Sequence, residues 1–393
     1  MKRAVIVDAV RSPMGKGKPG GALAGVHPVD LLAQVLSGLV ARNGLDPARI
    51  DDVIVGAVNQ AGEQSGTPAR QAVLAAGFPL HVPGVTIERK CGSGQQAVDF
   101  AVQGVMAGAY DIVIAGGVES MSRLPMGSNR IGQDPHGPRV RERFPELPSQ
   151  GVAADLIAHK WGLTRTQLDE FSARSHSRAA QARTEGWFAE EIVPIATPEG
   201  LVSVDETIRE STTVEKLAGL KTVFATESVQ EQFPDVGWSV TAGNSSQITD
   251  GASALLIMSE EAAAALGLTP LAAVVASAVV GDDPVLMLTG PIPATAKVLG
   301  RSGLDLSEIS TFEVNEAFAS VPLAWQAEFE ISDDLINPLG GAVALGHPLG
   351  ASGARLMTTM IHQLRRTGGR YGLQTMCEAG GMANATIIES LTQ

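Results

Sequence analysis

Two cysteines are the residues of this sequence best suited to nucleophilic chemistry, and each lies beside glycines. Cys91 stands in KCGSGQQAV and Cys377 in TMCEAGGMANA, so we expect both in glycine-rich turns. Glycine lets a backbone or a ligand approach closely, whereas a structural cysteine is usually a small inert side chain among apolar neighbours. The glycine setting favours reactive thiols, provided that the chain supplies a base.

The position of Cys91 predicts partial activation of its thiol. It lies one residue before the helical pattern SGQQAVDFAVQGVMAG, and a helix start favours the thiolate through free N–H groups and the dipole. A thiol with a pKa near 8.5 is half ionised at neutral pH only after about 2 kcal/mol of differential stabilisation. A helix terminus contributes about 0.3–1 kcal/mol. A second group is therefore needed.

His347 is the best candidate for that second group. It lies in GGAVALGHPLGASGARL, among five glycines and a proline. Chain bends at such residues position a side chain and do not serve packing. Asn315 and Glu316 open NEAFAS directly after the strand-like run STFEV. Such a pair can simply cap a following helix. A functional role for it depends on the other motifs in the chain. The remaining histidines have no comparable setting, and we expect them to be surface or core residues: His27, His81, His136, His159, His176 and His362.

The elements that must position these residues follow a βαβα order. Short runs rich in Val and Ile predict strands, and longer periodic runs that end at glycine predict helices. Unbroken apolar strands are typical of a sheet covered on both faces, so we expect a layered α/β fold. The strand runs are AVIVDAV, DDVIVGAV, VTIE and DIVIAGG, and the helix runs include PVDLLAQVLSGLVARNG.

The middle of the chain differs in composition, which predicts three parts. Pro, Gly and Arg are frequent after residue 120, and charged helices follow. We expect an N-terminal α/β half from 1–120 plus 244–268, an inserted helical and loop-rich subdomain at 121–243 that covers the active site, and a C-terminal α/β half at 269–393.

A weak internal repeat relates the two halves. CGSG opens a helix that is followed by GAYDIVIAGG, and GASG opens the helix ARLMTTMIHQLRRTGG that is followed by YGLQTMCEAGG. Two halves related by a pseudo-twofold would place these helix starts in comparable positions. Cys91 lies at one start and His347 just ahead of the other.

Composition excludes several classes of function. The chain has 393 residues and a net charge of −13 without a long basic run, which argues against nucleic-acid binding. Two cysteines make no disulfide framework and no zinc motif, so we expect a reducing compartment, the cytoplasm, and no metal. Asp8 interrupts the first apolar run and Pro270 breaks the stretch 262–281. We therefore expect neither a signal peptide nor a membrane span.

Taken together, the motifs resemble those of the thiolase family, acyl-CoA C-acyltransferases. The resemblance runs from VIVDAVRSPMGK near the start to NATIIES near the end, so it covers essentially the whole chain. Six motifs in order, with both cysteines and the histidine in place, make it specific. The motifs are CGSG, GGVESMSR, TAGNSSQITDGA, NEAFAS, GGAVALGHPLGASGAR and the late Cys-containing Gly-Gly motif.

The resemblance implies a thiolase-like fold, with two pseudo-symmetric αβαβα halves and an inserted subdomain, and a two-step acyl transfer. Cys91 would take the acyl group of a 3-oxoacyl-CoA, His347 would accept its proton, and Cys377 would protonate the departing acetyl-CoA enolate and later deprotonate coenzyme A. The reverse direction would be a Claisen condensation. The resemblance further implies a homodimer or homotetramer, with acyl-CoA and coenzyme A as substrates and no permanently bound cofactor.

It also implies the binding residues. One oxyanion hole would use His347 and a water held by Asn315, and the other the backbone N–H groups of Cys91 and Ala379. Ala379 replaces the glycine usual in the family, a change that strains alanine only if φ must be positive. The residues implied for coenzyme A and substrate are Ser246, Phe318, Gln150, Gly346 and Pro348.

Gln150 stands where short-chain biosynthetic thiolases often have methionine, which favours a larger acyl pocket like that of degradative thiolases of fatty-acid β-oxidation and sterol breakdown. Two alternatives stay open. A decarboxylating condensing enzyme would share the fold but generally lacks a second catalytic cysteine. A non-thiolytic acyl-CoA or lipid-binding relative typically loses the nucleophile or the histidine, and this chain keeps Cys91, His347 and Cys377.

Overall fold

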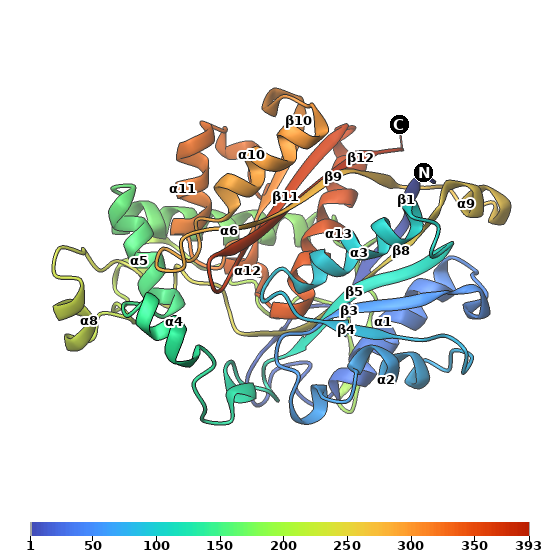
Figure 1. The fold of residues 1–393 in the computed structure, drawn as a ribbon, viewed down its shortest axis with the longest axis horizontal. Helices are drawn as coiled ribbons and strands as arrows, with labels where there is room; N and C mark the ends of the chain where they lie inside the picture. The colour runs from blue at the N-terminus through green and yellow to red at the C-terminus, as the bar shows by residue number, and fades with distance from the viewer. Residues whose placement is uncertain (1, 393) are drawn as a thin grey trace.

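The computed structural model describes residues 2–392, and strands and helices alternate along most of that length (Figure 1). The strands are β1 (Ala4–Arg11), β2 (Gly15–Lys16), β3 (Asp52–Gly56), β4 (Val85–Ile87), β5 (Ile112–Ser120), β6 (Ile195–Thr197), β7 (Gly200–Val202), β8 (Thr249–Ser259), β9 (Ala272–Gly281), β10 (Ile309–Val314), β11 (Tyr371–Glu378) and β12 (Met382–Ser390). The α-helices are α1 (Pro28–Arg42), α2 (Pro68–Ala75), α3 (Ser93–Met106), α4 (Gly137–Arg143), α5 (Gln150–Lys160), α6 (Arg165–Thr184), α7 (Val214–Ala218), α8 (Glu227–Gln232), α9 (Glu260–Leu266), α10 (Pro291–Ser302), α11 (Ser320–Phe329), α12 (Ala342–Leu345) and α13 (Leu349–Thr367).

One large mixed sheet organises the described chain, in the order β10-β11-β12-β9-β1-β8-β5-β3-β4, with β2 paired beside β8. Pairing is parallel between β10 and β11 and between β3 and both of its neighbours, and antiparallel elsewhere. The two halves of the sheet join only where β1 meets β9, at Val5↔Ala273 and Ile6↔Ala272. Because only these two residue pairs join them, the two halves of the sheet can face each other across a layer of helices.

Two helices fill the space between the halves of the sheet. α13 contacts β5 and β8 on one side and β10 and β11 on the other, and α3 packs beside it. The outer face of the first half is covered by α1 and α2, and that of the second half by α10. The result is a five-layer αβαβα arrangement, which confirms the predicted fold class.

Glycines bring the first turns of the two central helices into contact. A Cβ added to Gly94 of α3 would lie 2.7 Å from the carbonyl oxygen of Gly350, and one added to Gly353 of α13 would lie 2.4 Å from the backbone nitrogen of Gln95. Only residues without a side chain allow backbones to approach this closely. The residues that directly precede each helix are therefore brought to the same place.

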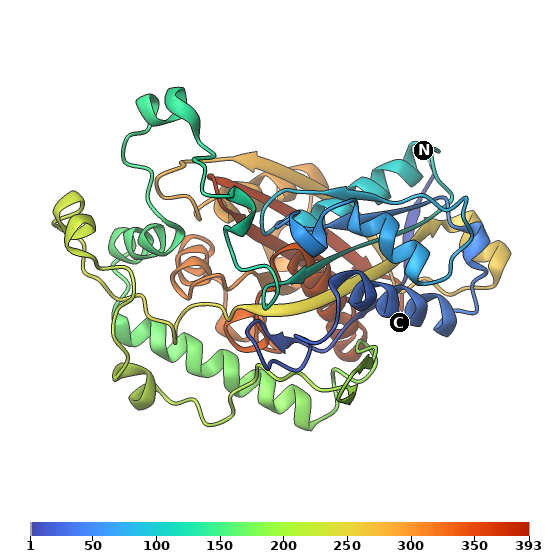
Figure 2. The ribbon, with the colours of Figure 1, turned by 90° about the horizontal axis from the view of Figure 1, so that it is seen from below.

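The strands and helices predicted from the runs quoted above all form, with ends within a few residues of those expected. The prediction of a turn around Cys377 is wrong, because Cys377 lies within β11 and the glycine turn begins at Ala379. The segment 121–243 carries α4 to α8, and in both views α4 and α8 project from one end of the molecule (Figure 2). The division into three parts stays a prediction.

Between residues 2 and 392, none of the helices is both long enough and apolar enough to span a bilayer.

Candidate active site

A cavity of about 1270 Å³ lies where the nucleophile turn, the inserted segment and the C-terminal half meet. Its wall includes Cys91 from the turn before α3, Gln150 and Phe224 from the inserted segment, and Phe318 and Ala379 from the C-terminal half. Residues far apart in sequence thus share one wall, and four of the residues implied by the motifs line it directly: Cys91, Gln150, Phe318 and Ala379.

The turn that carries Cys91 is tight and leaves the thiol nearly buried. Lys90 has a φ of 46°, and Ser93 donates its backbone N–H to the carbonyl of Lys90 at 3.1 Å. Cys91 is 4% exposed and packs against Leu349 and Met376, near neighbours of His347 and Cys377 in the chain. The segments that carry His347 and Cys377 therefore lie close to Cys91.

Electrostatics correct the expectation that the helix start lowers the pKa of the Cys91 thiol. Burial raises the pKa of the Cys91 thiol well above its ordinary value, and Cys377 and Glu378 raise it further. The backbone N–H groups of Cys91 and Ala379 act in the opposite direction but are outweighed. The helix start is thus too weak to overcome burial, and the thiol keeps its proton until a base removes it.

His347 is held rigidly by its neighbours. Gly346 has a φ of +90°, and a Cβ there would lie 2.1 Å from Thr249 Oγ1. The backbone N–H of His347 donates to Thr249 Oγ1 at 3.1 Å and to the carbonyl of Gln247 at 3.1 Å. Glycine is therefore required before the histidine, and β8 fixes the position of its backbone.

The hydrogen bonds of the imidazole define which nitrogen can act as a base. Ser352 Oγ donates to the carbonyl of Pro348 at 2.9 Å, so it accepts a hydrogen bond from His347 Nδ1 at 2.6 Å. With the proton on Nδ1, the lone pair is on Nε2, which has no partner among the described residues. Burial, together with the charge of Arg355, lowers the pKa of His347 to about 3. The imidazole is neutral at rest and can accept a proton at Nε2.

Cys377 and Asn315 form the third part of the site. Asn315 Nδ2 donates to Cys377 Sγ at 3.7 Å, and both side chains are buried. Cys377 packs with Ala317 and Phe318, so it lies directly behind the cavity wall. Burial raises the pKa of Cys377 to about 12, although the Asn315 hydrogen bond opposes the shift. A protonated thiol beside the cavity suits a proton donor.

Ala379 replaces glycine without strain. Its φ is not among the positive values of the described non-glycine residues, and the left-handed conformations fall on Gly380 and Gly381. The Ala379 N–H stabilises the charged form of Cys91. This N–H group is therefore available where the motifs predict an oxyanion donor.

The remaining predicted residues shape the surroundings. Ser246 donates its backbone N–H to the carbonyl of Ala317 at 2.9 Å, which ties its loop to the segment of Asn315. Pro348 caps α13 and accepts the bond from Ser352. Gln150 begins α5 and faces the cavity. Their contacts with coenzyme A stay predictions.

Sequence reasoning missed Glu119 and considered Glu316 only beside Asn315, but both are buried carboxyl groups that hold the site together. Glu119 accepts hydrogen bonds from the backbone N–H groups of Val58, Asn59 and Gly350. Glu316 accepts from the hydroxyl of Ser175, the amide of Asn337 and the N–H of Val343. A carboxylate within or at the end of an apolar strand was the available signal, since burial of such a group requires several partners.

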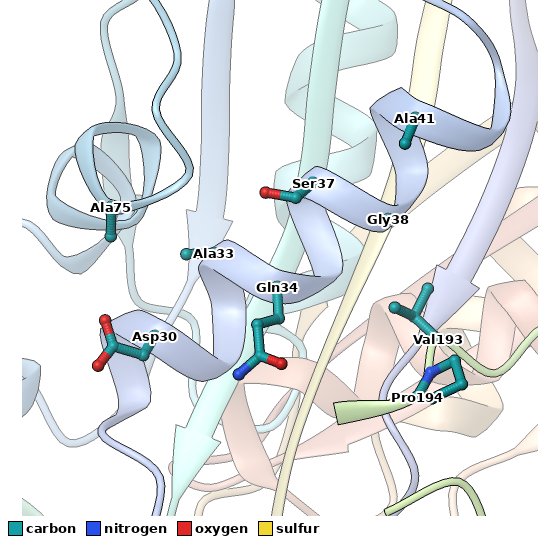
Figure 3. A pocket seen from close by; sticks show the side chains of 9 residues that line it. All are labelled: Asp30, Ala33, Gln34, Ser37, Gly38, Ala41, Ala75, Val193 and Pro194. Atoms are coloured by element: carbon teal, nitrogen blue, oxygen red, sulfur yellow. The ribbon is translucent and has the colours of Figure 1, made fainter. Parts of the chain in front are cut away.

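A second hollow does not compete for the chemistry. It has a volume of about 480 Å³ and runs along α1, with Asp30, Ser37 and Val193 in its wall (Figure 3). Gln34 in the same wall is already bonded to the backbone of Ala196. The wall holds one carboxylate and no thiol or imidazole. Nor do three or more acidic, His or Cys side chains gather in a metal-holding cluster anywhere in residues 2–392.

Comparison with known proteins gives one consistent result. Models of the thiolase N-terminal and C-terminal domains match residues 4–261 and 268–390. A steroid 3-ketoacyl-CoA thiolase of Mycobacterium tuberculosis is 47% identical over 400 residues, which cover 100% of this chain and 95% of that protein. A beta-ketoadipyl-CoA thiolase of Escherichia coli is 44% identical over 412 residues, covering 99% of this chain and 100% of that protein. The crystal structure of the Bacillus anthracis acetyl-CoA acetyltransferase superposes with a TM-score of 0.88 at 40% identity, covering 100% of this chain and 99% of the other.

Proposed function

The chain belongs to the thiolase family, and we propose that it cleaves 3-oxoacyl-CoA with coenzyme A through an acyl-enzyme on Cys91. Its relatives named thiolase and acetyl-CoA acetyltransferase are acyltransferases, and this chain shares their full length. The observation that carries the residue assignment is that Cys91 and Ala379 line one cavity from different parts of the chain, with Cys377 directly behind its wall.

In the first half-reaction, Cys91 Sγ attacks the 3-oxo carbon and its proton passes to Nε2 of His347. The bond between C2 and C3 breaks, and Cys377 protonates the enolate of acetyl-CoA. The backbone N–H groups of Cys91 and Ala379 support one oxyanion, and each such donor is worth about 2.7–4 kcal/mol. His347 and Asn315 support the enolate oxygen.

In the second half-reaction, coenzyme A regenerates the enzyme. Cys377 removes the thiol proton of coenzyme A, which attacks the thioester on Cys91. The bond between Cys91 Sγ and the acyl carbon breaks, and His347 returns its proton to the sulfur. A thiolate is both a good nucleophile and a good leaving group, so the same steps run in reverse as a condensation. Coenzyme A enters as substrate, and the scheme uses no resident cofactor.

We further propose a bulky acyl group. The wall of the cavity includes the apolar side chains of Met126, Phe144 and Met287. Gln150 in that wall and the steroid substrate named for the Mycobacterium tuberculosis relative agree with this choice. The division into halves and insert, a homodimer or homotetramer, and a cytoplasmic location complete the proposal.

Steady-state thiolysis tests the proposal. Acetoacetyl-CoA, a medium-chain 3-oxoacyl-CoA and a sterol-derived 3-oxoacyl-CoA are compared at equal coenzyme A concentration. We expect thiolysis, with the highest kcat/KM for the largest acyl group. Turnover that requires malonyl-CoA would support a decarboxylating condensing enzyme instead. No thiolysis, or thiolysis that survives alkylation of Cys91, would reject the proposal.

A further inference from the structure

A buried carboxyl group lies against the nucleophile turn, and the reaction scheme does not use it. Glu378 is the last residue of β11 and is 0% exposed. A Cβ placed on Gly92, the residue after Cys91, would lie 1.9 Å from Glu378 Oε1 and 2.9 Å from Asn384 Nδ2. Since side chains alternate along a strand, Glu378 points to the opposite face of β11 from Cys377. The carboxyl therefore packs on the backbone of the nucleophile turn.

This carboxyl has no compensating hydrogen bond from the protein. Both oxygens of Glu378 lack a hydrogen-bond partner among the described residues. The same holds for Asp99 Oδ2 and Arg89 Nε, which face the same region. By contrast, Glu119 is as deeply buried but accepts four hydrogen bonds. A purely structural carboxyl would be expected to have such partners, so the neutral form of Glu378 is favoured.

The charged groups around Glu378 come from two neighbouring parts of the chain. Arg89 and Glu88 belong to the segment between β4 and α3, and Asp99 lies on α3. Asp99 accepts a hydrogen bond from Thr386 Oγ1 of β12 at 3.0 Å. Arg89 is the cation that acts on Glu378 directly, and Lys90 is ion-paired with Glu88 at 2.8 Å. The remaining ionisable neighbours are the thiols of Cys91 and Cys377.

We propose that Glu378 is a positioning residue that sets the reactivity of Cys91: in its neutral form it permits the thiolate, and in its ionised form it opposes it. This inference rests on the proposed role of Cys91 as the nucleophile. Burial raises the pKa of Glu378 to about 8, with Arg89 opposing and Asp99 and Glu88 adding to the shift. Glu378 in turn raises the pKa of the Cys91 thiol. Glu378 is therefore neutral at neutral pH, and above about pH 8 its negative charge opposes ionisation of the Cys91 thiol.

The pH profile of Cys91 alkylation tests this inference. The free protein is treated with iodoacetamide between pH 6 and 10, and labelling of the Cys91 peptide is followed by mass spectrometry. An isolated thiol gains rate tenfold per pH unit below its pKa. The wild-type plot of log rate against pH should bend to a shallower slope near pH 8, and Glu378→Gln should remove the bend. The ratio of the variant rate to the wild-type rate should grow about tenfold between pH 7 and 9.

Two further variants separate charge from packing. Glu313 is a buried carboxyl on β10 whose pKa burial also raises to about 8, and both of its oxygens lack partners among the described residues. It is not among the groups that shift Cys91, so Glu313→Gln should keep the bend. Asp99→Asn removes a negative neighbour of Glu378 and should move the bend to lower pH. If Glu378→Gln does not fold, this shift alone decides the question.

The outcomes also separate this inference from the proposed function. Parallel wild-type and Glu378→Gln profiles, or a bend that Asp99→Asn leaves in place, would overturn the role of Glu378 even if thiolysis is normal. Loss of the bend in Glu378→Gln would support it whether or not the protein shows thiolysis, because alkylation needs no acyl-CoA. Absence of thiolysis would count against the proposed function alone.

Discussion

Gly94 of α3 lies directly against Gly350 of α13, so closely that a Cβ on Gly94 would be 2.7 Å from the Gly350 carbonyl oxygen. The same Cβ would lie 3.0 Å from the backbone nitrogen of Ala354. Neither atom belongs to a flexible side chain that can move aside. This contact joins the starts of the two central helices, and it explains how Cys91 and His347 reach one site from distant parts of the chain.

Gly94→Ala should therefore damage both stability and activity. The added methyl must separate α3 from α13, and overpacking of this kind costs about 1–3 kcal/mol. Thermal unfolding and kcat for thiolysis measure the two effects. Gly300→Ala is the matched control, because Gly300 also lies in a helix but has open space around its Cβ position. The control should be neutral or more stable, since alanine favours helix. Equal effects of the two substitutions would contradict the importance of the contact.

Ser352→Ala should weaken the base without unfolding the protein. The substitution removes the acceptor that holds the proton on His347 Nδ1, so Nε2 is no longer fixed as the base. We expect kcat for thiolysis to fall about 10- to 100-fold, with a small change in the free energy of unfolding. Ser172→Ala is the matched control, because Ser172 is a buried helical serine that also bonds the carbonyl four residues earlier. A kcat equal to that of this control would show that Ser352 does not orient the imidazole.

Cys377→Ser should separate acyl transfer by Cys91 from proton transfer by Cys377. Acylation of Cys91 by acetyl-CoA releases no enolate and needs no thiol at position 377, whereas removal of the α-proton of acetyl-CoA does. We expect the variant to form some acyl-enzyme but to lose condensation and exchange of the acetyl-CoA methyl protons in deuterated water, which NMR follows. Normal exchange in this variant would assign the proton transfer to another group. Cys91→Ala gives the complementary result, with no acyl-enzyme.

Acid should destabilise the fold through buried neutral histidines. Burial lowers the pKa of His176 to about 4, and its Nδ1 accepts the backbone N–H of Arg209. The folded pKa is below the unfolded value near 6.5, so between about pH 6.5 and 4 the unfolded chain binds the extra proton. Stability from this group is present above pH 6.5 and is lost as pH falls, by up to about 3 kcal/mol.

Urea unfolding at pH 7 and pH 5 measures this loss. His176→Asn should lower the stability at pH 7 but reduce the difference between the two pH values. The comparison isolates His176 from the buried carboxyl groups, such as Asp99, whose pKa burial raises and which act in the opposite direction. Equal pH differences in wild type and variant would show that His176 is not held neutral by the fold.

Much of the fold was predictable because its signals are local. Apolar strands and glycine-terminated helices were read from periodicity, and the repeat of small-residue turn, helix and strand indicated two related halves. The close contact of Gly94 with Gly350 was not predictable, since glycines at a helix start are equally compatible with exposure to solvent. The placement of Cys377 within β11 was not predictable from the motif either, because Gly380 and Gly381 indicate a turn but do not show where the strand before it ends.

The candidate site shows the same limit. Cys91, His347 and Cys377 were recognised by type and surroundings, but the ionisation of Cys91 was predicted in the wrong direction. Helix position is visible in sequence, whereas the burial that outweighs it depends on residues from other segments, such as Leu349 and Met376. Glu378 follows Cys377 directly in the chain and yet was overlooked, because nothing local indicates that its carboxyl lies on Gly92.

The identity of the acylated residue decides whether Cys91 is the nucleophile. The protein is mixed with a 3-oxoacyl-CoA in the absence of free coenzyme A, quenched with acid and digested, and the peptides that contain Cys91 and Cys377 are weighed by mass spectrometry. We predict an acyl adduct on the Cys91 peptide that coenzyme A removes. An adduct on the Cys377 peptide, or no thioester on either, would contradict the account.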